Sequence, residues 1–314
     1  MGENNTEGVD IRERELAARG YSLRFLLGQG ATSAVYCVKE VKSGKNYACK
    51  AGVRKEWLAE EYELLSCQHH PLFPGAVEFW QGEAEGFLVM EYLDGCCLED
   101  CLKRRGHFSQ REAVRIAMEL ADGLGSLHNG GIPAVYRDLK PSNIMIRPDG
   151  SARLMDLGAV KRLEGSICVP KGQQTAGAGM VSYRAGTPGF SAPEQFEAGA
   201  EVDIRADIYA LGKVLLSMLG GCDPVSGQVG NKGRRVPVAG GLRGVTDSCL
   251  QRDPAFRIPD MGEVLRRLRC CLDSSGGRIC RGRTSAVWGG RRTERIRYEK
   301  NILKSSHQTD ITAQ

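Results

Sequence analysis

The sequence lacks any apolar run long enough to cross a membrane. Its most apolar helical stretch, residues 208–219, is interrupted by Lys213, whereas a spanning helix needs roughly 20 predominantly apolar residues. The N-terminal sequence MGENNTEGVD also lacks the basic and apolar regions of a secretory signal. These absences predict a soluble, cytoplasmic protein.

The cysteines and histidines follow no pattern of a disulfide framework or a metal site. Twelve cysteines are scattered over 314 residues, and without an export signal we expect reduced thiols that mostly fill the core. Cys96, Cys97 and Cys101 lack the CxxC spacing of a zinc site, and the five histidines form no HExxH pair. A metal-dependent hydrolase is therefore not favoured.

The net charge of +5 is concentrated at the C-terminal end. Residues 275–314 hold nine Lys and Arg against three Asp and Glu, a balance of +6, so the preceding 274 residues sum to −1. We expect residues 273–314 to be a basic, disordered tail. Such a tail is either simply solvated or contacts an acidic partner or a membrane surface, and nucleic acid is not expected as a partner.

The rest of the chain has the composition of a globular protein. Residues 1–20 are polar and look like a leader. Residues 21–93 contain five short β-prone runs separated by glycine-rich and charged turns, with one helical segment at residues 56–67. The pattern of residues 94–272 predicts mainly helical structure. The pattern predicts an α+β fold with a small sheet-rich part and a larger helical part.

A glycine-rich run, GQGATSAV, lies between the first two β-prone runs and contains Gly28, Gln29, Gly30 and Ser33. Glycines let a backbone approach a polyphosphate closely, although a tight hairpin turn is the commoner explanation of such a run. A β-prone run follows where a dinucleotide-binding fingerprint would open a helix, so that fingerprint is excluded.

Lys50 ends an otherwise apolar β-prone run, where a charged side chain needs an anionic partner. The next helical segment has an apolar stripe centred on Glu61 and formed by Trp57, Leu58, Leu64 and Leu65. An acid at the centre of a buried face is the predicted partner of Lys50. The pair serves either a phosphate-binding site or a structural salt bridge.

The most informative segment is YRDLKPSN at residues 136–143, followed by DLG at residues 156–158. Two acids, a lysine and an amide at short intervals suit phosphoryl transfer. One carboxylate can receive a hydroxyl proton, the other can hold Mg²⁺, and the lysine can offset charge on the moving phosphoryl group.

With these motifs the sequence resembles the protein kinases, and more particularly a bacterial serine/threonine kinase of the eukaryotic type. The resemblance extends over residues 21–272, and its motifs occur in the order of the family. It implies a two-lobed fold. Residues 21–93 would form a small antiparallel-sheet lobe with one helix, and residues 94–272 a larger, mainly helical lobe.

The resemblance also implies the role of each site residue. The catalytic residues would be Asp138, Lys140, Lys50 and Glu61, with Asn143 and Asp156 as ligands of Mg²⁺ or Mn²⁺. ATP would contact Gly28, Gln29, Gly30, Ser33, Val35, Ala48, Lys50, Met90, Glu91, Leu93 and Met145. The end of the activation segment and the substrate pocket would involve Thr187, Glu194 and Arg257. The core helix of the large lobe would contain Asp207 and Gly212.

The resemblance implies transfer of the γ-phosphoryl group of ATP to serine or threonine hydroxyls of proteins. Lys140 lies two residues after Asp138, which is the pattern of serine/threonine kinases in this family. The hydroxyl of Thr187 can form hydrogen bonds with both side chains. The alternatives are a pseudokinase scaffold, which binds nucleotide or partners without turnover, and a small-molecule kinase. The intact motifs disfavour the scaffold, and the run GTPGFSAPE at residues 186–194 disfavours the small-molecule kinase.

Activation by phosphorylation is a further expectation. The residues between Gly158 and Ala192 are rich in glycine, alanine and serine and have few large apolar groups to order them. In the family, an arginine at the position of Arg137 often binds a phosphate on this segment. The candidate phosphorylation sites are Ser166, Thr175 and Ser182. The alternative is that backbone carbonyls satisfy Arg137.

Overall fold

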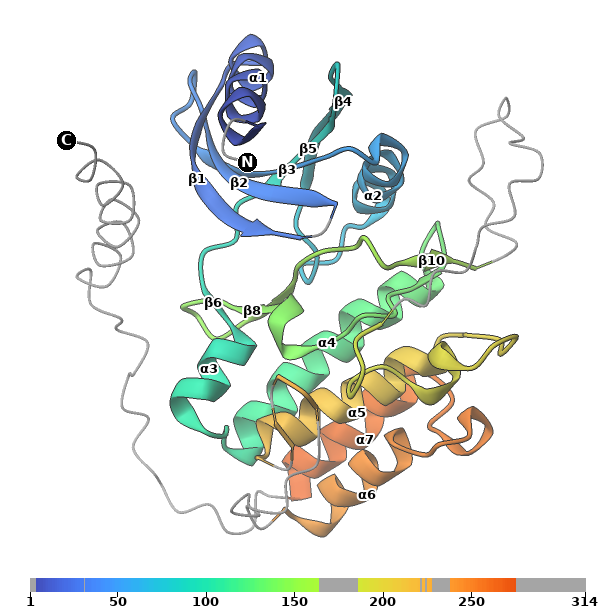
Figure 1. Cartoon of the computed structure of the whole chain (residues 1–314). Helices are drawn as coiled ribbons and strands as arrows, with labels where there is room; N and C mark the ends of the chain where they lie inside the picture. The colour runs from blue at the N-terminus through green and yellow to red at the C-terminus, as the bar shows by residue number, and fades with distance from the viewer. Residues whose placement is uncertain are drawn as a thin grey trace, which may run out of the picture. The chain divides into compact units, whose positions relative to one another are not determined.

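The computed structural model describes residues 4–30, 32–163, 186–220, 222–223, 225–227 and 238–274 (Figure 1). The chain divides into two units, Met1–Ser275 and Gly276–Gln314, and all described residues belong to the first. In the described part of the chain, no helix has the length and apolar character needed to cross a membrane.

The first lobe is built on a five-stranded antiparallel sheet. Its strands lie in the order β1-β2-β3-β5-β4. They are β1 (Tyr21–Gln29), β2 (Ser33–Glu40), β3 (Asn46–Gly52), β4 (Ala76–Gln81) and β5 (Gly86–Glu91). Each strand corresponds to one of the five β-prone runs, because the turns that separate them are marked locally by glycine and charged residues.

One face of this sheet is covered by α2 (Lys55–Cys67), which contacts β3, β4 and β5. Its buried residues are Leu58, Glu61, Leu64 and Leu65. The predicted stripe is therefore confirmed except at Trp57, which is 43% exposed. Trp57 lies one turn before Glu61, and the guanidinium of Arg54 lies over its ring instead.

The N-terminal segment, described from sequence as a polar leader, contains the helix α1 (Asn4–Ala18), which contacts β1. Leu16 is 1% exposed and belongs to a buried cluster that includes Phe87 and Val89 of β5. The intervening residues Leu88 and Met90 belong to the main core, on the side of α2. Because successive residues of a strand point to opposite faces, α1 covers the face opposite α2.

Polar contacts also hold α1 on the sheet. The guanidinium of Arg12 donates to both carboxylate oxygens of Glu85, at 2.5 and 2.6 Å, and to the hydroxyl of Tyr36, at 2.6 Å. Arg19 directly follows α1, and its guanidinium lies 5.2 Å from the centre of the Trp80 ring. This packing could not be predicted from the sequence, because the contacts come from one leucine and two arginines. Such contacts produce no periodic pattern of apolar residues.

The second lobe is mainly helical. Its helices are α3 (Leu98–Arg105), α4 (Gln110–Asn129), α5 (Arg205–Met218), α6 (Gly240–Cys249) and α7 (Met261–Ser274). The central helix α4 packs against α5 and α7, as Figure 1 shows. Its start is fixed by a capping box, in which Ser109 and Glu112 bond each other's backbone amides.

Short strands and turns next to the helices of the second lobe position the chemistry-bearing segments. A three-stranded sheet has the order β6-β8-β9, and a two-stranded sheet pairs β7 with β10. These strands are β6 (Cys96–Cys97), β7 (Ala134–Val135), β8 (Ile144–Ile146), β9 (Ala152–Leu154) and β10 (Lys161–Arg162). Three short 3-10 helices lie at Pro141–Asn143, Pro193–Phe196 and Pro254–Phe256.

The packing of α1 predicts a stability effect. Leu16→Ala should lower the free energy of unfolding by about 2–5 kcal/mol, because it removes a fully buried leucine. Ile11→Ala, on the same helix at a position that is 43% exposed, should change it by less than about 0.5 kcal/mol. Urea unfolding of both variants measures the difference, and equal effects would contradict the packing of α1 on the sheet.

Candidate active site

The first part of the site is a buried ammonium group between two carboxylates. Lys50 lies in β3, next to Val35 of β2 and Leu88 of β5, and is 7% exposed. Its Nζ lies 2.7 Å from Oε2 of Glu61 and 2.7 Å from Oδ1 of Asp156. The predicted pairing of Lys50 with Glu61 is confirmed.

Electrostatics keeps Lys50 and Asp156 charged. Burial by itself lowers the pKa of Lys50, but the negative charges of Glu61 and Asp156 outweigh it, so the pKa is raised above its ordinary value. Burial raises the pKa of Asp156, but the charge and hydrogen bond of Lys50 outweigh this effect, so that pKa is lowered. Lys50 is therefore a permanent cation at neutral pH.

Backbone amides fix the acids around Lys50. Oε1 of Glu61 accepts a hydrogen bond from the amide of Leu157 at 3.1 Å, and Oδ1 of Asp156 accepts one from the amide of Gly158 at 3.0 Å. A Cβ on Gly158 would lie 3.0 Å from that same oxygen and 3.4 Å from Nζ of Lys50. Glycine at this position therefore lets the chain pass close to the ion pair.

The second part of the site is organised around the carboxylate of Asp138. Oδ1 accepts a hydrogen bond from the hydroxyl of Thr187 at 2.7 Å, and Oδ2 lies 2.8 Å from Nζ of Lys140. Lys140 also donates to the Thr187 hydroxyl at 2.7 Å. The amide of Asn143 donates to Oδ2 and to the backbone carbonyl of Asp138, at 3.1 and 3.0 Å. The structure thus brings together four residues that the sequence named.

Asp207 of α5 supports the backbone just before Asp138. It is fully buried and accepts hydrogen bonds at 2.8 Å from the amides of Tyr136 and Arg137 and from Nε2 of His128. Arg137 has a φ of 67°, a left-handed conformation that is strained for a non-glycine residue. Asp207 therefore stabilises an unfavourable backbone conformation that presents Asp138.

Three supporting residues were not found from the sequence. His128 orients Asp207, and the carbonyl of Arg137 accepts hydrogen bonds from Gln195 at 2.8 Å and from Ser191 at 3.5 Å. Each contact joins residues more than 50 positions apart, so no local pattern indicates them.

The residues assigned to ATP belong to the β1–β2 hairpin, to β3, to the end of β5 and the residues after it, and to β8. Gly28 and Gln29 pair with Val35 and Ala34 across the β1–β2 hairpin, and the amide of Gly30 donates to the carbonyl of Ser33 at 2.8 Å. Ala48 of β3 pairs with Met90 of β5, and each is 8% exposed. Glu91 ends β5, Leu93 follows it, and Met145 of β8 pairs with Cys97.

The end of the activation segment is anchored by a buried ion pair. The guanidinium of Arg257 donates to both oxygens of Glu194, at 2.6 and 2.7 Å. Its remaining N–H groups donate to the carbonyls of Gln251, Arg252 and Arg205. This ion pair ties Pro193–Phe196 to the loop before α7.

The candidate phosphorylation sites Ser166, Thr175 and Ser182 lie outside the described residues. Arg137, expected to bind their phosphate, donates from Nε to the carbonyl of Ala159 at 2.7 Å. The alternative expectation, that backbone carbonyls satisfy Arg137, therefore holds for Nε, one of its three guanidinium nitrogens.

Comparison with known proteins identifies the family. Residues 21–257 match the protein kinase domain. The chain belongs to the protein kinase family. It is 32% identical over 213 residues to serine/threonine-protein kinase pkn2 of Myxococcus xanthus and 31% identical over 231 residues to the probable serine/threonine-protein kinase PknB of Bifidobacterium longum. It is 28% identical over 311 residues to PknA of Corynebacterium glutamicum.

These alignments cover 64%, 68% and 91% of this protein kinase chain. They cover 24%, 32% and 63% of the three relatives. The chain therefore spans less than two thirds of the length of each relative.

The kinase site fits a hard divalent cation. The side chain of Asp156 is 55% exposed, and Asn143 donates through its nitrogen, which leaves its amide oxygen as a ligand. Within the described ranges, no group of three or more His, Cys, Asp or Glu residues could hold a metal ion by itself. Two oxygen ligands suit Mg²⁺, which keeps water and substrate phosphate as its other ligands.

The Glu194–Arg257 pair predicts a second stability effect. Arg257→Met should lower the free energy of unfolding by about 3–5 kcal/mol, because it leaves the carboxylate of Glu194 buried and unpaired. The double variant Arg257→Met/Glu194→Gln should be less destabilised than this single variant, since neither charge remains.

The control is Arg252→Met, whose side chain is 87% exposed and whose loss should change stability by less than about 1 kcal/mol. Chemical unfolding followed by tryptophan fluorescence gives all three values. A double variant at least as unstable as Arg257→Met would show that the charge of Glu194 is not the cause.

Proposed function

We propose that this protein is a serine/threonine protein kinase, which transfers the γ-phosphoryl group of ATP to serine or threonine hydroxyls of proteins. The observation that carries the proposal is the hydrogen-bonded set of Asp138, Lys140, Asn143 and Thr187. It places a carboxylate, an ammonium group and an amide within one small region, next to the end of the activation segment. The names of the relatives agree with this proposal.

At the phosphate end, the ammonium group of Lys50 would bind the α- and β-phosphates, with Glu61 holding it in place. Asn143 and Asp156 would hold Mg²⁺, which offsets the phosphate charge when bound. Mn²⁺ is an alternative ion because it prefers the same oxygen ligands. The turn from Gly28 to Ser33 would cover the phosphates with its backbone amides.

At the acceptor end, Asp138 would accept a hydrogen bond from the substrate hydroxyl and then its proton as the phosphoryl group is transferred. Lys140, 2.8 Å from this carboxylate, would offset negative charge on the phosphoryl oxygens. The hydroxyl of Thr187 donates to Asp138 and accepts from Lys140, so it keeps both side chains in position beside the activation segment.

The two alternatives are less well supported. A pseudokinase scaffold commonly lacks one of the key groups, whereas Lys50, Asp138, Asn143 and Asp156 are all present and all four have hydrogen-bond partners within the site. A small-molecule kinase has little use for an anchored peptide-positioning segment such as the one that Arg257 holds through Glu194.

The partners would be proteins with accessible serine or threonine residues. Binding of an acidic partner or a membrane surface by residues 275–314 remains a proposal that rests on their charge alone, because these residues lie outside the described part of the chain. A cytoplasmic location is part of the same proposal, since the reaction consumes ATP.

The proposal predicts loss of transfer in two variants. Lys50→Met removes the phosphate ligand and Asp156→Asn weakens the metal ligand, so each should lower kcat/KM by more than about 100-fold. Incubation with labelled ATP, Mg²⁺ and a general protein substrate measures the effect, and chelation of Mg²⁺ should abolish activity in the unchanged protein.

The control is Lys103→Met, at an exposed lysine of α3 that pairs with Glu99 and should keep its activity. Circular dichroism confirms that each variant is folded. Near-normal turnover in either of the two site variants, or no turnover in the unchanged protein, would contradict the proposed function.

Phosphorylation of the activation segment is a further prediction. We expect autophosphorylation at Thr175 or Ser182, because the two terminal nitrogens of Arg137 have no hydrogen-bond partner among the described residues and a phosphate offers oxygens for both. Mass spectrometry of active protein identifies the site. Thr175→Ala/Ser182→Ala should lower activity, and full activity in this variant would exclude both residues as the switch.

A further inference from the structure

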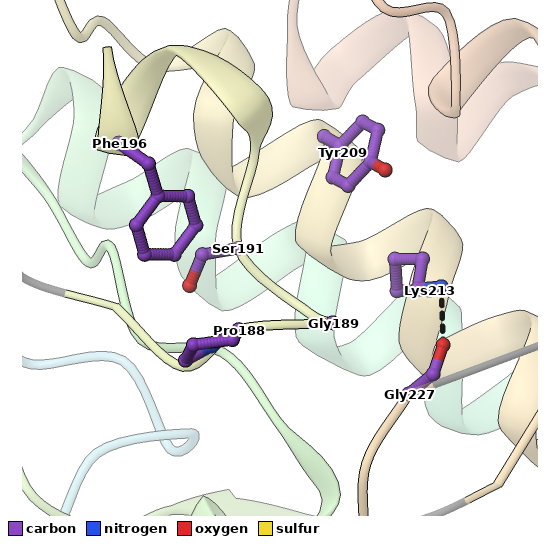
Figure 2. Close-up of a pocket in the computed structure, with 7 residues that line it drawn as sticks. All are labelled: Pro188, Gly189, Ser191, Phe196, Tyr209, Lys213 and Gly227. Atoms are coloured by element: carbon purple, nitrogen blue, oxygen red, sulfur yellow. Dashed lines mark hydrogen bonds between the residues drawn. The ribbon is translucent and has the colours of Figure 1, made fainter.

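A pocket of about 630 Å³ lies directly beyond the activation-segment anchor. Figure 2 shows it between Pro188 and Gly189 on one side and α5 on the other, with Phe196, Tyr209 and Lys213 around it. No residue assigned above to ATP or metal binding lines it. The pocket is therefore separate from the Lys50 and Asp156 part of the site.

Two glycines form one wall of the pocket by direct backbone contact. Gly189 has a φ of 94° and Gly227 a φ of 65°. A Cβ on Gly189 would lie only 1.9 Å from the carbonyl oxygen of Ser226, and a Cβ on Gly227 would lie 2.4 Å from that of Gly189. Any side chain at either position would force these segments apart, so the wall is specific to this pair of glycines.

Lys213 brings a positive charge to the pocket. It lies within α5 and is only 8% exposed. Its Nζ donates to the carbonyl of Gly227 at 2.5 Å, the contact drawn in Figure 2. No carboxylate forms an ion pair with it in the part of the chain that the structure describes. A buried ammonium group with three donors and one neutral acceptor is incompletely compensated, so it favours an added anion.

The pocket lies next to the acceptor end of the site. Pro188, which lines it, follows Thr187 directly, and the Thr187 hydroxyl lies 2.7 Å from Oδ1 of Asp138. Consecutive residues of an extended chain are about 3.8 Å apart. The pocket therefore lies within reach of a side chain that is a few residues from a hydroxyl at Asp138.

We propose that Lys213 makes this pocket a subsite for an acidic or phosphorylated side chain of the substrate, within three residues of the phosphorylated hydroxyl. This inference rests on the proposed kinase function and names its substrate class. The carboxylate or phosphate would accept from the free donors of Lys213, while the rings of Phe196 and Tyr209 and the Pro188–Gly189 backbone would enclose its stem.

The first experiment is a peptide scan with the full-length protein. A central serine or threonine is fixed, and each of the three positions on either side carries Asp, Asn, Glu, Gln or phosphoserine. At one position we expect kcat/KM to be at least about tenfold higher for Asp or Glu than for Asn or Gln, the effect of one charge-assisted hydrogen bond. A scan with no such position overturns the inference.

The second experiment assigns the preference to Lys213. In Lys213→Met, which keeps the length of the side chain, the acidic-to-neutral ratio at that position should fall to about one. Lys213→Arg should keep part of it, because the charge remains. Lys103→Met, at an exposed lysine, is the matched control and should keep the full ratio. An unchanged ratio in Lys213→Met overturns the assignment.

Inorganic phosphate distinguishes a substrate subsite from a site for a free ion. In the unchanged protein it should inhibit reaction of the acidic peptide more than that of its neutral partner, and this difference should vanish in Lys213→Met. Lys213-dependent inhibition without any acidic preference would identify a free-phosphate site and overturn the substrate subsite.

The outcomes also separate this inference from the proposed function. If no peptide and no protein is phosphorylated, the kinase function itself fails. If all peptides react equally well, the function stands and only the subsite fails. If Lys213→Met does not fold, the scan of the unchanged protein and the ratio in Lys213→Arg, which must stay above one, still decide the matter.

Discussion

The arrangement of the site depends first on the ammonium group of Lys50. It joins three segments that are distant in sequence: β3, α2 through Glu61, and the turn that contains Asp156. A buried charge without a partner is strongly unfavourable, so these segments are stable together and unfavourable apart. A shift of α2 would leave both Lys50 and the amide of Leu157 without Glu61. The proposed phosphate-binding end therefore forms as one unit, and the covered faces of the β-sheet hold β3 in place behind it.

At the acceptor end, a buried carboxylate fixes the backbone through hydrogen bonds from its amides. Asp207 at the start of α5 holds the amides of Tyr136 and Arg137 and so stabilises the left-handed conformation that presents Asp138. Lys213 lies less than two turns further along the same helix. One rigid helix thus supports the segment that would carry out transfer and the pocket that would select the substrate, which couples the geometry of the two.

Several features of the site were predictable because their causes are local. The five strands follow the β-prone runs between glycine-rich and charged turns, and Glu61 was found because a helical period places it on the buried face. Trp57 fits the same period but is exposed, since the sheet covers only part of that helix face. The helix α1 was missed because a single leucine and the aromatic and acidic partners of two arginines attach it to the sheet, and such contacts have no sequence period.

The sequence by itself predicted a small sheet-rich part, a larger helical part and the pairing of Lys50 with Glu61, because repeated spacing and residue chemistry are local properties. Its resemblance to the protein kinases added the two lobes and the residues that surround Asp138. Only the tertiary structure decided that His128 orients Asp207, that Gln195 and Ser191 hold the carbonyl of Arg137, and that Gly189 touches Gly227 beside Lys213. Gln195, for example, is 58 residues from Arg137 along the chain. Such contacts arise when folding closes long loops, and no window of sequence contains both partners.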